Sequence, residues 1–229
     1  MSQLSPTLRR YLIAIWTISL ATWISSWFLR FDHRPLSWPL LGALLGLLVL
    51  TQSLPQHILR GTKITLSTVP LFVAALSLPV SAAVSIALAG VALAQGRRRR
   101  PWYELSFNVA SAGLEVYVGG VIWALLALIP GAWAAPAATL LCAAALYVIN
   151  VSAVAGAVAA QHRLTYRHVW HQIATAEMLD HGLMFLVGGL LVLPLVWKPL
   201  AAALMLAGIA TRLILRVRRE DWVLRKQQI

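Results

Sequence analysis

The chain has 229 residues, of which 60% are hydrophobic and only 11% are charged. Ordinary globular domains are about half apolar and about a quarter charged, so this composition excludes a soluble globular protein and indicates a membrane protein. The net charge of +12 would suggest a nucleic-acid partner for a soluble protein. In membrane proteins, however, basic residues collect in cytoplasmic loops and face anionic lipid, so we expect the lipid bilayer as partner and no nucleic acid.

Six apolar segments approach the length of membrane-spanning helices, which need about 20 mostly apolar residues. In chain order these predicted spans are 11–29, 39–54, 103–128, 136–160, 179–197 and 199–215. A further apolar block, 64–95, is interrupted by Pro70 and Pro79, and proline tends to start or break a helix. It predicts a hairpin of a short helix, 70–78, and a second helix, 80–95; the short helix either crosses the bilayer or re-enters it.

Two further helices are predicted outside the bilayer. The segment 161–178 is too polar to span, yet it carries apolar residues among its basic ones, which is typical of an amphipathic helix lying on the inner surface. The basic segment at about 212–227 predicts a cytoplasmic C-terminal helix. We therefore expect an all-α polytopic bundle, a single transmembrane domain over 1–229 with about six to eight membrane helices.

The basic residues predict the orientation of the bundle. With the N-terminus inside, only Arg30, Arg34 and Lys198 of the 19 Lys and Arg residues fall outside, which favours both termini in the cytoplasm. The run Arg97, Arg98, Arg99 and Arg100 then marks a cytoplasmic loop. Together with Trp102 it is expected to contact lipid headgroups or a partner protein.

One acidic residue, Glu115, falls near the middle of the predicted span 103–128. A charged side chain there costs about 2.5 to 3.5 kcal/mol, so it calls for an explanation. Asn108, Ser111 and Glu115 follow a spacing of three and four residues and share one helical face. Asn150, on the following helix, lies at a depth that meets this face. Two interpretations remain open: a site for a ligand or a proton, and a structural hydrogen bond between helices.

A second polar cluster, 177–182, opens the predicted span 179–197. Its acids are favoured at a helix N-terminus, so capping is one interpretation. The other is that Asp180 or His181 reaches inward toward Arg212 on the last helix.

Motifs for catalysis and metal binding are missing from the sequence. His162, His168 and His171 form no i, i+4 pair with a catalytic acid, and the single cysteine, Cys142, offers neither a disulfide nor a Cys-based metal site. The sequence also lacks a phosphate-binding glycine loop and a Gly-x-Ser-x-Gly elbow. We therefore expect no metal and no enzymatic activity, and no cofactor can be named.

The stretch KITLSTVPLFVAALSLPVSAAVSIALAGVALAQGRRRRPWYELSFNVASAGL combines an apolar hairpin, an Arg-rich turn, Pro-Trp-Tyr and a helix with an early Phe-Asn. It resembles the N-terminal membrane domain of bacterial cyclic-di-GMP signalling proteins that carry HD-GYP or GGDEF domains. The later YVINVSAVAGAVAAQHRLTYRHVW fits the same pattern. More weakly, the layout is similar to the substrate-binding S components of energy-coupling-factor transporters. The printed chain has no output domain after 219, so we carry over neither cyclase nor phosphodiesterase activity.

The resemblance implies a multi-pass protein of the bacterial inner membrane. We expect a sensory or accessory module that binds a small or lipophilic ligand, or a partner membrane protein or further copy, through the face around Asn108, Glu115 and Asn150. The alternatives are a substrate-binding subunit of a vitamin-type transporter and a structural subunit of a larger membrane complex.

Overall fold

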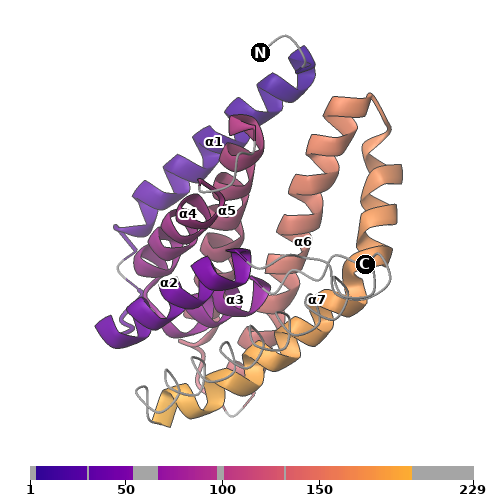
Figure 1. Ribbon diagram of the computed structural model, residues 1–229. Helices are drawn as coiled ribbons and strands as arrows, with labels where there is room; N and C mark the ends of the chain where they lie inside the picture. The colour runs from indigo at the N-terminus through magenta and orange to yellow at the C-terminus, as the bar shows by residue number, and fades with distance from the viewer. Residues whose placement is uncertain (1–3, 30, 54–66, 97–100, 132, 198–229) are drawn as a thin grey trace, which may run out of the picture.

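The computed structural model describes residues 4–29, 31–53, 67–96, 101–131 and 133–197, with side chains given as far as Val192. Throughout these ranges the only regular secondary structure is α-helix (Figure 1). The seven described helices are α1 (Pro6–Ser26), α2 (Trp38–Ser53), α3 (Thr68–Ser77), α4 (Val80–Gly96), α5 (Trp102–Leu126), α6 (Ala134–His162) and α7 (Tyr166–Trp197). The predicted elements 199–215 and 212–227 lie outside the described residues.

The all-α class and the membrane character are confirmed. α5, α6 and α7 are long and apolar enough to cross a membrane, whereas α2, α3 and α4 are shorter apolar helices. The ten residues of α3 rise about 15 Å, half of the roughly 30 Å of hydrocarbon in a bilayer. α3 is therefore too short to cross alone, which favours the re-entrant form of the predicted hairpin.

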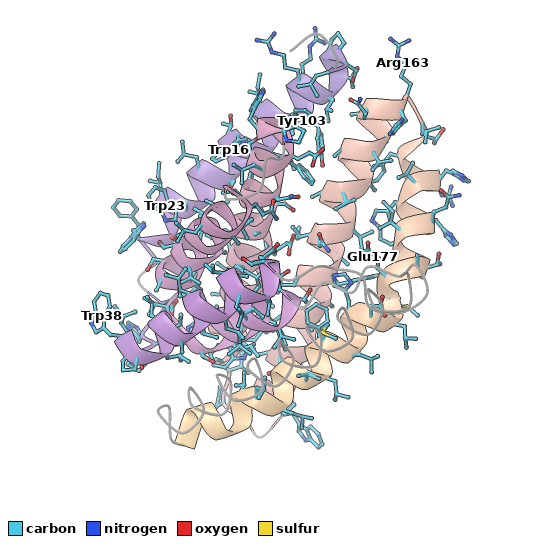
Figure 2. The ribbon with its side chains drawn as sticks, in the orientation of Figure 1. Trp16, Trp23, Trp38, Tyr103, Arg163 and Glu177 are labelled. Carbon is cyan, nitrogen blue, oxygen red and sulfur yellow. The ribbon has the colours of Figure 1, made fainter. Side chains whose placement is uncertain are left out.

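α5 lies in the middle of the described bundle, with α1, α3, α4 and α6 packed against it (Figure 1). The main hydrophobic core is formed by α3 and α4 with α5 on one side and α2 on the other, and Leu48, Phe72 and Val116 are almost completely buried in it. Side chains at the rim face outward. Figure 2 shows Trp38 projecting from the start of α2, where it is 71% exposed.

The turn between α3 and α4 follows from Pro79. Leu78, the residue before it, has an extended backbone with φ −111° and ψ 156°, because the proline ring disfavours the helical conformation of its predecessor. α3 therefore ends at Ser77 and α4 begins at Val80. The predicted hairpin is confirmed to within two residues at each end.

An ion pair between Asp32 and Arg34 holds this turn from the α1–α2 connection. The carboxylate of Asp32 accepts hydrogen bonds from Nε of Arg34 at 2.8 Å and from the backbone N–H of Val80 at 2.6 Å. Arg34 donates in turn to the carbonyl of Ala75 at 2.6 Å and lies 5.3 Å from the ring centre of Trp123. The pair thus caps the N-terminus of α4 and the last turn of α3 at once.

The prediction of a separate surface helix at 161–178 is wrong, as is the predicted start of a new span at 179. α6 ends at His162, Arg163 takes a left-handed conformation with φ 55°, and one continuous α7 then runs from Tyr166 to Trp197. The residues around 178 include no proline, and the one glycine there, Gly182, lies within the helix without ending it, so the change in polarity does not interrupt the backbone. Figure 1 shows the first part of α7 running beside α6 and the rest passing beneath α3.

Two clusters fix these two parts of α7. Val169 is buried with Ala155 and Ala159 of α6. Further along, the ring of Phe185 meets the ring of Phe72 edge-on, with 5.0 Å between the ring centres. α7 therefore connects α6 to α3.

Close packing of α5 on α6 depends on Gly119. A Cβ atom there would clash with the side chain of Leu146 and come within 3.0 Å of Sγ of Cys142. We expect Gly119→Val to lower the free energy of unfolding by about 1–3 kcal/mol, because the added methyl groups force α5 and α6 apart. The measurement is thermal unfolding in detergent. Gly42→Val on α2 is the control, since nothing lies within 4 Å of that position; equal losses at both sites would contradict this packing.

The Asp32–Arg34 pair predicts a pH dependence of stability. Burial opposes ionisation of Asp32, but its hydrogen bonds with Arg34 and Val80 and the charge of Arg34 hold its pKa below the usual value. A lowered pKa stabilises the fold above the unfolded-state value of about 3.9, and this contribution is lost as the pH falls through the folded-state pKa. We therefore expect the melting temperature to fall between about pH 5 and pH 2, and less so in Asp32→Asn, which keeps the cap but not the charge. Parallel melting curves for both proteins would contradict the role of the pair.

Candidate functional site

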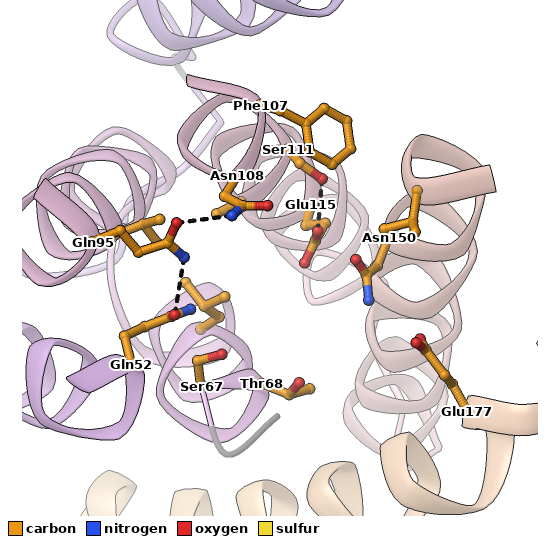
Figure 3. Close-up of a pocket in the computed structure, with 14 residues that line it drawn as sticks. Gln52, Ser67, Thr68, Gln95, Phe107, Asn108, Ser111, Glu115, Asn150 and Glu177 are labelled. Atoms are coloured by element: carbon orange, nitrogen blue, oxygen red, sulfur yellow. Dashed lines mark hydrogen bonds between the residues drawn. The ribbon is translucent and has the colours of Figure 1, made fainter. Parts of the chain in front are cut away.

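A cavity of about 310 Å³ lies within the bundle, between α2, α4, α5, α6 and α7 and the start of α3 (Figure 3). Most of the described residues that line it are polar, and none of these is Lys, Arg or His. The polar ones are Gln52, Ser67, Thr68, Gln95, Asn108, Ser111, Glu115, Asn150 and Glu177. The apolar ones are Leu71, Val91, Phe107, Ala112 and Val154.

Three amide side chains form one wall of the cavity. Nδ2 of Asn108 donates to Oε1 of Gln95 at 2.8 Å, and Nε2 of Gln95 donates to Oε1 of Gln52 at 3.1 Å. Gln52 and Gln95 are both buried. This chain of hydrogen bonds ties α2 and α4 to α5, and buried amides of this kind are costly when a partner is missing.

Glu115 lies one helical turn beyond Ser111, and the hydroxyl of Ser111 donates to its Oε1 at 3.0 Å. In Figure 3 the carboxyl group of Glu115 and the amide of Asn150 face the same space from α5 and α6. The spacing of three and four residues therefore does bring Asn108, Ser111 and Glu115 onto one face, and that face lines a cavity. Their role as ligand-binding residues stays a prediction.

Asn150 is linked to α7 through His181, which is buried. Nδ2 of Asn150 lies 3.1 Å from Nε2 of His181, and Nδ1 of His181 lies 3.1 Å from the backbone carbonyl of Glu177. A carbonyl can only accept, so Nδ1 carries the hydrogen and Nε2 accepts from the amide. This geometry is that of a neutral imidazole.

Two hydroxyl groups at the start of α3 have no hydrogen-bond partner among the described residues. Ser67 is 3% exposed and Thr68 is 9% exposed, and both line the cavity. Figure 3 shows their side chains pointing into it from below the amide wall. A hydroxyl group both donates and accepts hydrogen bonds, so these two, which face the cavity, are suited to bind a ligand or water.

The remaining predicted site residues fall elsewhere. Asp180 is half-buried on α7 but does not line the cavity, and the cluster 177–182 sits inside a continuous helix, so the capping interpretation is wrong. Trp102 begins α5 and is 55% exposed. Arg97, Arg98, Arg99, Arg100 and Arg212 lie outside the described residues.

Sequence reasoning missed Gln52, Gln95 and the orientation of Glu177. Each glutamine lies near the end of an apolar helix, where it looks like a boundary residue, and no spacing rule relates positions 52 and 95. The sequence placed Glu177 at a helix start, although it lies 11 residues after Tyr166, the first residue of α7. The available signal was that both amides fall inside predicted apolar helices, where a polar side chain is costly unless it finds a hydrogen-bond partner.

A second hollow, of about 750 Å³, lies between α1, α5 and α6. It is lined mainly by apolar side chains, among them Ile15, Ile18 and Leu114, with Tyr11 at its edge. The Tyr11 hydroxyl donates to the carbonyl of Ala153 at 2.8 Å. This groove suits a lipid chain, whereas the polar cavity suits a small ligand with hydrogen-bonding groups. In the described part of the chain, no three His, Cys, Asp or Glu residues gather to hold a metal ion.

The amide wall predicts a coupled loss of stability. Gln95→Leu leaves the side chains of Gln52 and Asn108 without their partner and should lower the free energy of unfolding by about 1–3 kcal/mol. Gln52→Leu should lower the free energy of unfolding less in the Gln95→Leu variant than in the wild type. In that variant the Gln52 amide has already lost its hydrogen bond with Gln95. Thermal unfolding of the two single variants and the double variant measures this coupling. If the two losses of unfolding free energy simply add in the double variant, the hydrogen bond between Gln95 and Gln52 contributes nothing to stability.

We compared the chain with protein-family models, curated proteins and solved structures, and none of them gave a significant match. The resemblance to membrane domains of signalling proteins therefore remains a prediction from the sequence, and the function has to be argued from the cavity.

Proposed function

We propose that this chain is a non-enzymatic, polytopic module of the bacterial inner membrane that binds a small ligand in the polar cavity and serves a sensory or accessory role. The observation that carries this proposal is the cavity itself. Nine polar side chains from six helices and their ends converge on it, and two of them, Ser67 and Thr68, have hydroxyl groups that make no hydrogen bond within the described residues. A purely structural polar contact would not need an open volume at its centre.

The place of the cavity favours a sensory role over uptake from outside. Its lining on α5 runs from Phe107 to Glu115, from the second turn to the middle of that helix, and Gln52 and Gln95 lie in the last turns of α2 and α4. These ends lead into the basic segments that contain Arg60 and Arg97. With both termini in the cytoplasm, as the basic residues favour, the cavity occupies the cytoplasmic half of a bundle with about six to eight membrane helices. An uptake subunit would instead hold its substrate near the outer face.

α7 offers a route from the cavity to the rest of the chain. Glu177 lines the cavity, and His181, one turn later, contacts Asn150 of α6 and stacks near Phe185, with 6.0 Å between the ring centres. Phe185 packs in turn on Phe72 of α3. A ligand that contacts Asn150 or Glu177 therefore acts where α7 leaves α6 and turns toward α3. We propose that the basic segment 212–227 passes this change to a partner protein.

The first test asks whether the protein holds a compound in the cavity. The protein is extracted in mild detergent from its native membrane and analysed by native mass spectrometry, alongside Val154→Phe, which fills the cavity. Val148→Phe is the matched control, because Val148 is on the same helix but 45% exposed. We expect a bound small molecule in the wild type and in Val148→Phe, and its loss in Val154→Phe.

Three results would contradict the proposal. A compound retained in Val154→Phe would place the ligand elsewhere, for example in the apolar groove beside Tyr11. A stoichiometric ATPase-coupled partner would indicate a transporter subunit. A stable protein partner with no bound compound would indicate a structural subunit of a complex.

A further inference from the structure

The charges in the polar cavity are unbalanced. Glu115 and Glu177 both line it, whereas its described lining contains no Lys, Arg or His. Among the described residues, His181 lies beside Glu177, with Nδ1 3.9 Å from Oε2 of Glu177. Its ring nitrogens, however, are placed as in a neutral imidazole, with Nε2 facing the amide of Asn150. An ionised carboxylate away from water is costly unless a positive charge is close. The described lining supplies no such charge, so a bound cation would stabilise Glu115 in its ionised form.

The hydrogen-bonding groups of the cavity also favour a cationic ligand. Ser111 supplies one hydrogen bond to Glu115, and the second carboxylate oxygen, Oε2, accepts none from the described residues. The carbonyl oxygen of Asn150 is likewise without a donor, since its amide nitrogen is directed to His181. These oxygens, with the hydroxyls of Ser67 and Thr68, are mostly acceptors. A primary ammonium group carries three N–H donors and no acceptor, and so matches them.

The other wall sets the size and character of the rest of the ligand. Leu71, Val91 and Val154 are apolar, and Figure 3 shows the ring of Phe107 above Ser111. An aromatic face near a cation adds an attraction of about 0.5–2 kcal/mol. A volume of about 310 Å³ is at the small end of ligand sites, so the ligand has a short apolar body.

We propose that the cavity binds a small primary amine in its ammonium form, with Glu115 as the ion-pair partner and a short apolar body against Phe107. This inference rests on the proposed function and names the ligand class. Glu177, whose side chain is 41% exposed, adds a weaker attraction. An anionic ligand would meet two carboxyl groups, and the described lining offers no basic residue to offset them.

Three probes of the same shape test the charge of the ligand. Phenethylamine is cationic, 2-phenylethanol is its neutral counterpart, and 3-phenylpropionate is anionic. Each is titrated by calorimetry into the purified full chain in nanodiscs, with empty nanodiscs as the blank for partition into lipid. We expect phenethylamine to bind at least roughly tenfold more tightly than the alcohol, and the acid not to bind.

Carboxyl-to-amide variants test the residues. Glu115→Gln retains an acceptor for Ser111, so the fold should persist, but phenethylamine should bind at least roughly tenfold more weakly. Glu177→Gln should have a smaller effect. Asp180→Asn is the control, because Asp180 is on α7 beside the cavity without lining it. Melting curves confirm that each variant is folded.

The outcomes separate this inference from the proposed function. Equal affinity for amine and alcohol, preference for the acid, no binding of the amine, or full binding by Glu115→Gln would each overturn the amine inference. If a neutral or anionic compound is held by the wild type and lost in Val154→Phe, the ligand-binding module stands and only the amine inference fails. If no compound is held by any of these proteins, the proposed function fails as well.

Discussion

Polar side chains between membrane helices must find their hydrogen-bond partners within the protein, because hydrocarbon offers none. In this chain the constraint is met by the amide wall, in which Gln95 of α4 joins Gln52 of α2 to Asn108 of α5. These bonds position the part of α5 that carries Ser111 and Glu115 against α4 and, through Gln95, link it to α2. On one side of the cavity the amide wall makes its hydrogen bonds within the protein. On the opposite side, Glu115 and Asn150 face the open volume.

The far end of the α3–α4 hairpin is held in a different way. There Asp32 and Arg34 form an ion pair whose side chains are largely buried, and they bind the backbone at Val80 and Ala75. Charged hydrogen bonds to helix ends are strong, because the unpaired backbone groups of a helix carry partial charges. The short helix α3, which cannot span the bilayer, is thus fixed at its end by the pair. Its start contributes Ser67 and Thr68 to the cavity, so the hairpin connects an anchored turn with a binding site.

α7 changes its packing partner next to the cavity. α7 packs first on α6 through Val169 and later on α3 through Phe185, and the change occurs near Glu177 and His181. Ligands shift an equilibrium only when they contact the two states differently. Because Asn150 and Glu177 belong to helices that meet at this place, a ligand between them would be positioned to affect their packing. If α6 and α7 met only through apolar side chains, a small polar ligand would find no hydrogen-bonding groups between them.

The sequence by itself determined the membrane character, the position of α1 to α6 to within a few residues apart from the first turns of α1, and the shared face of Asn108, Ser111 and Glu115. Apolar runs, prolines and helical spacing are local properties, so they can be read along the chain. It did not determine that α7 is continuous, because a change in polarity shifts the environment of a helix without breaking its backbone. Nor did it determine the contacts of Gln52 with Gln95 or of Asp32 with Val80, which are 43 and 48 residues apart. Such contacts depend on which helix faces meet, and only the packing of the whole bundle decides that.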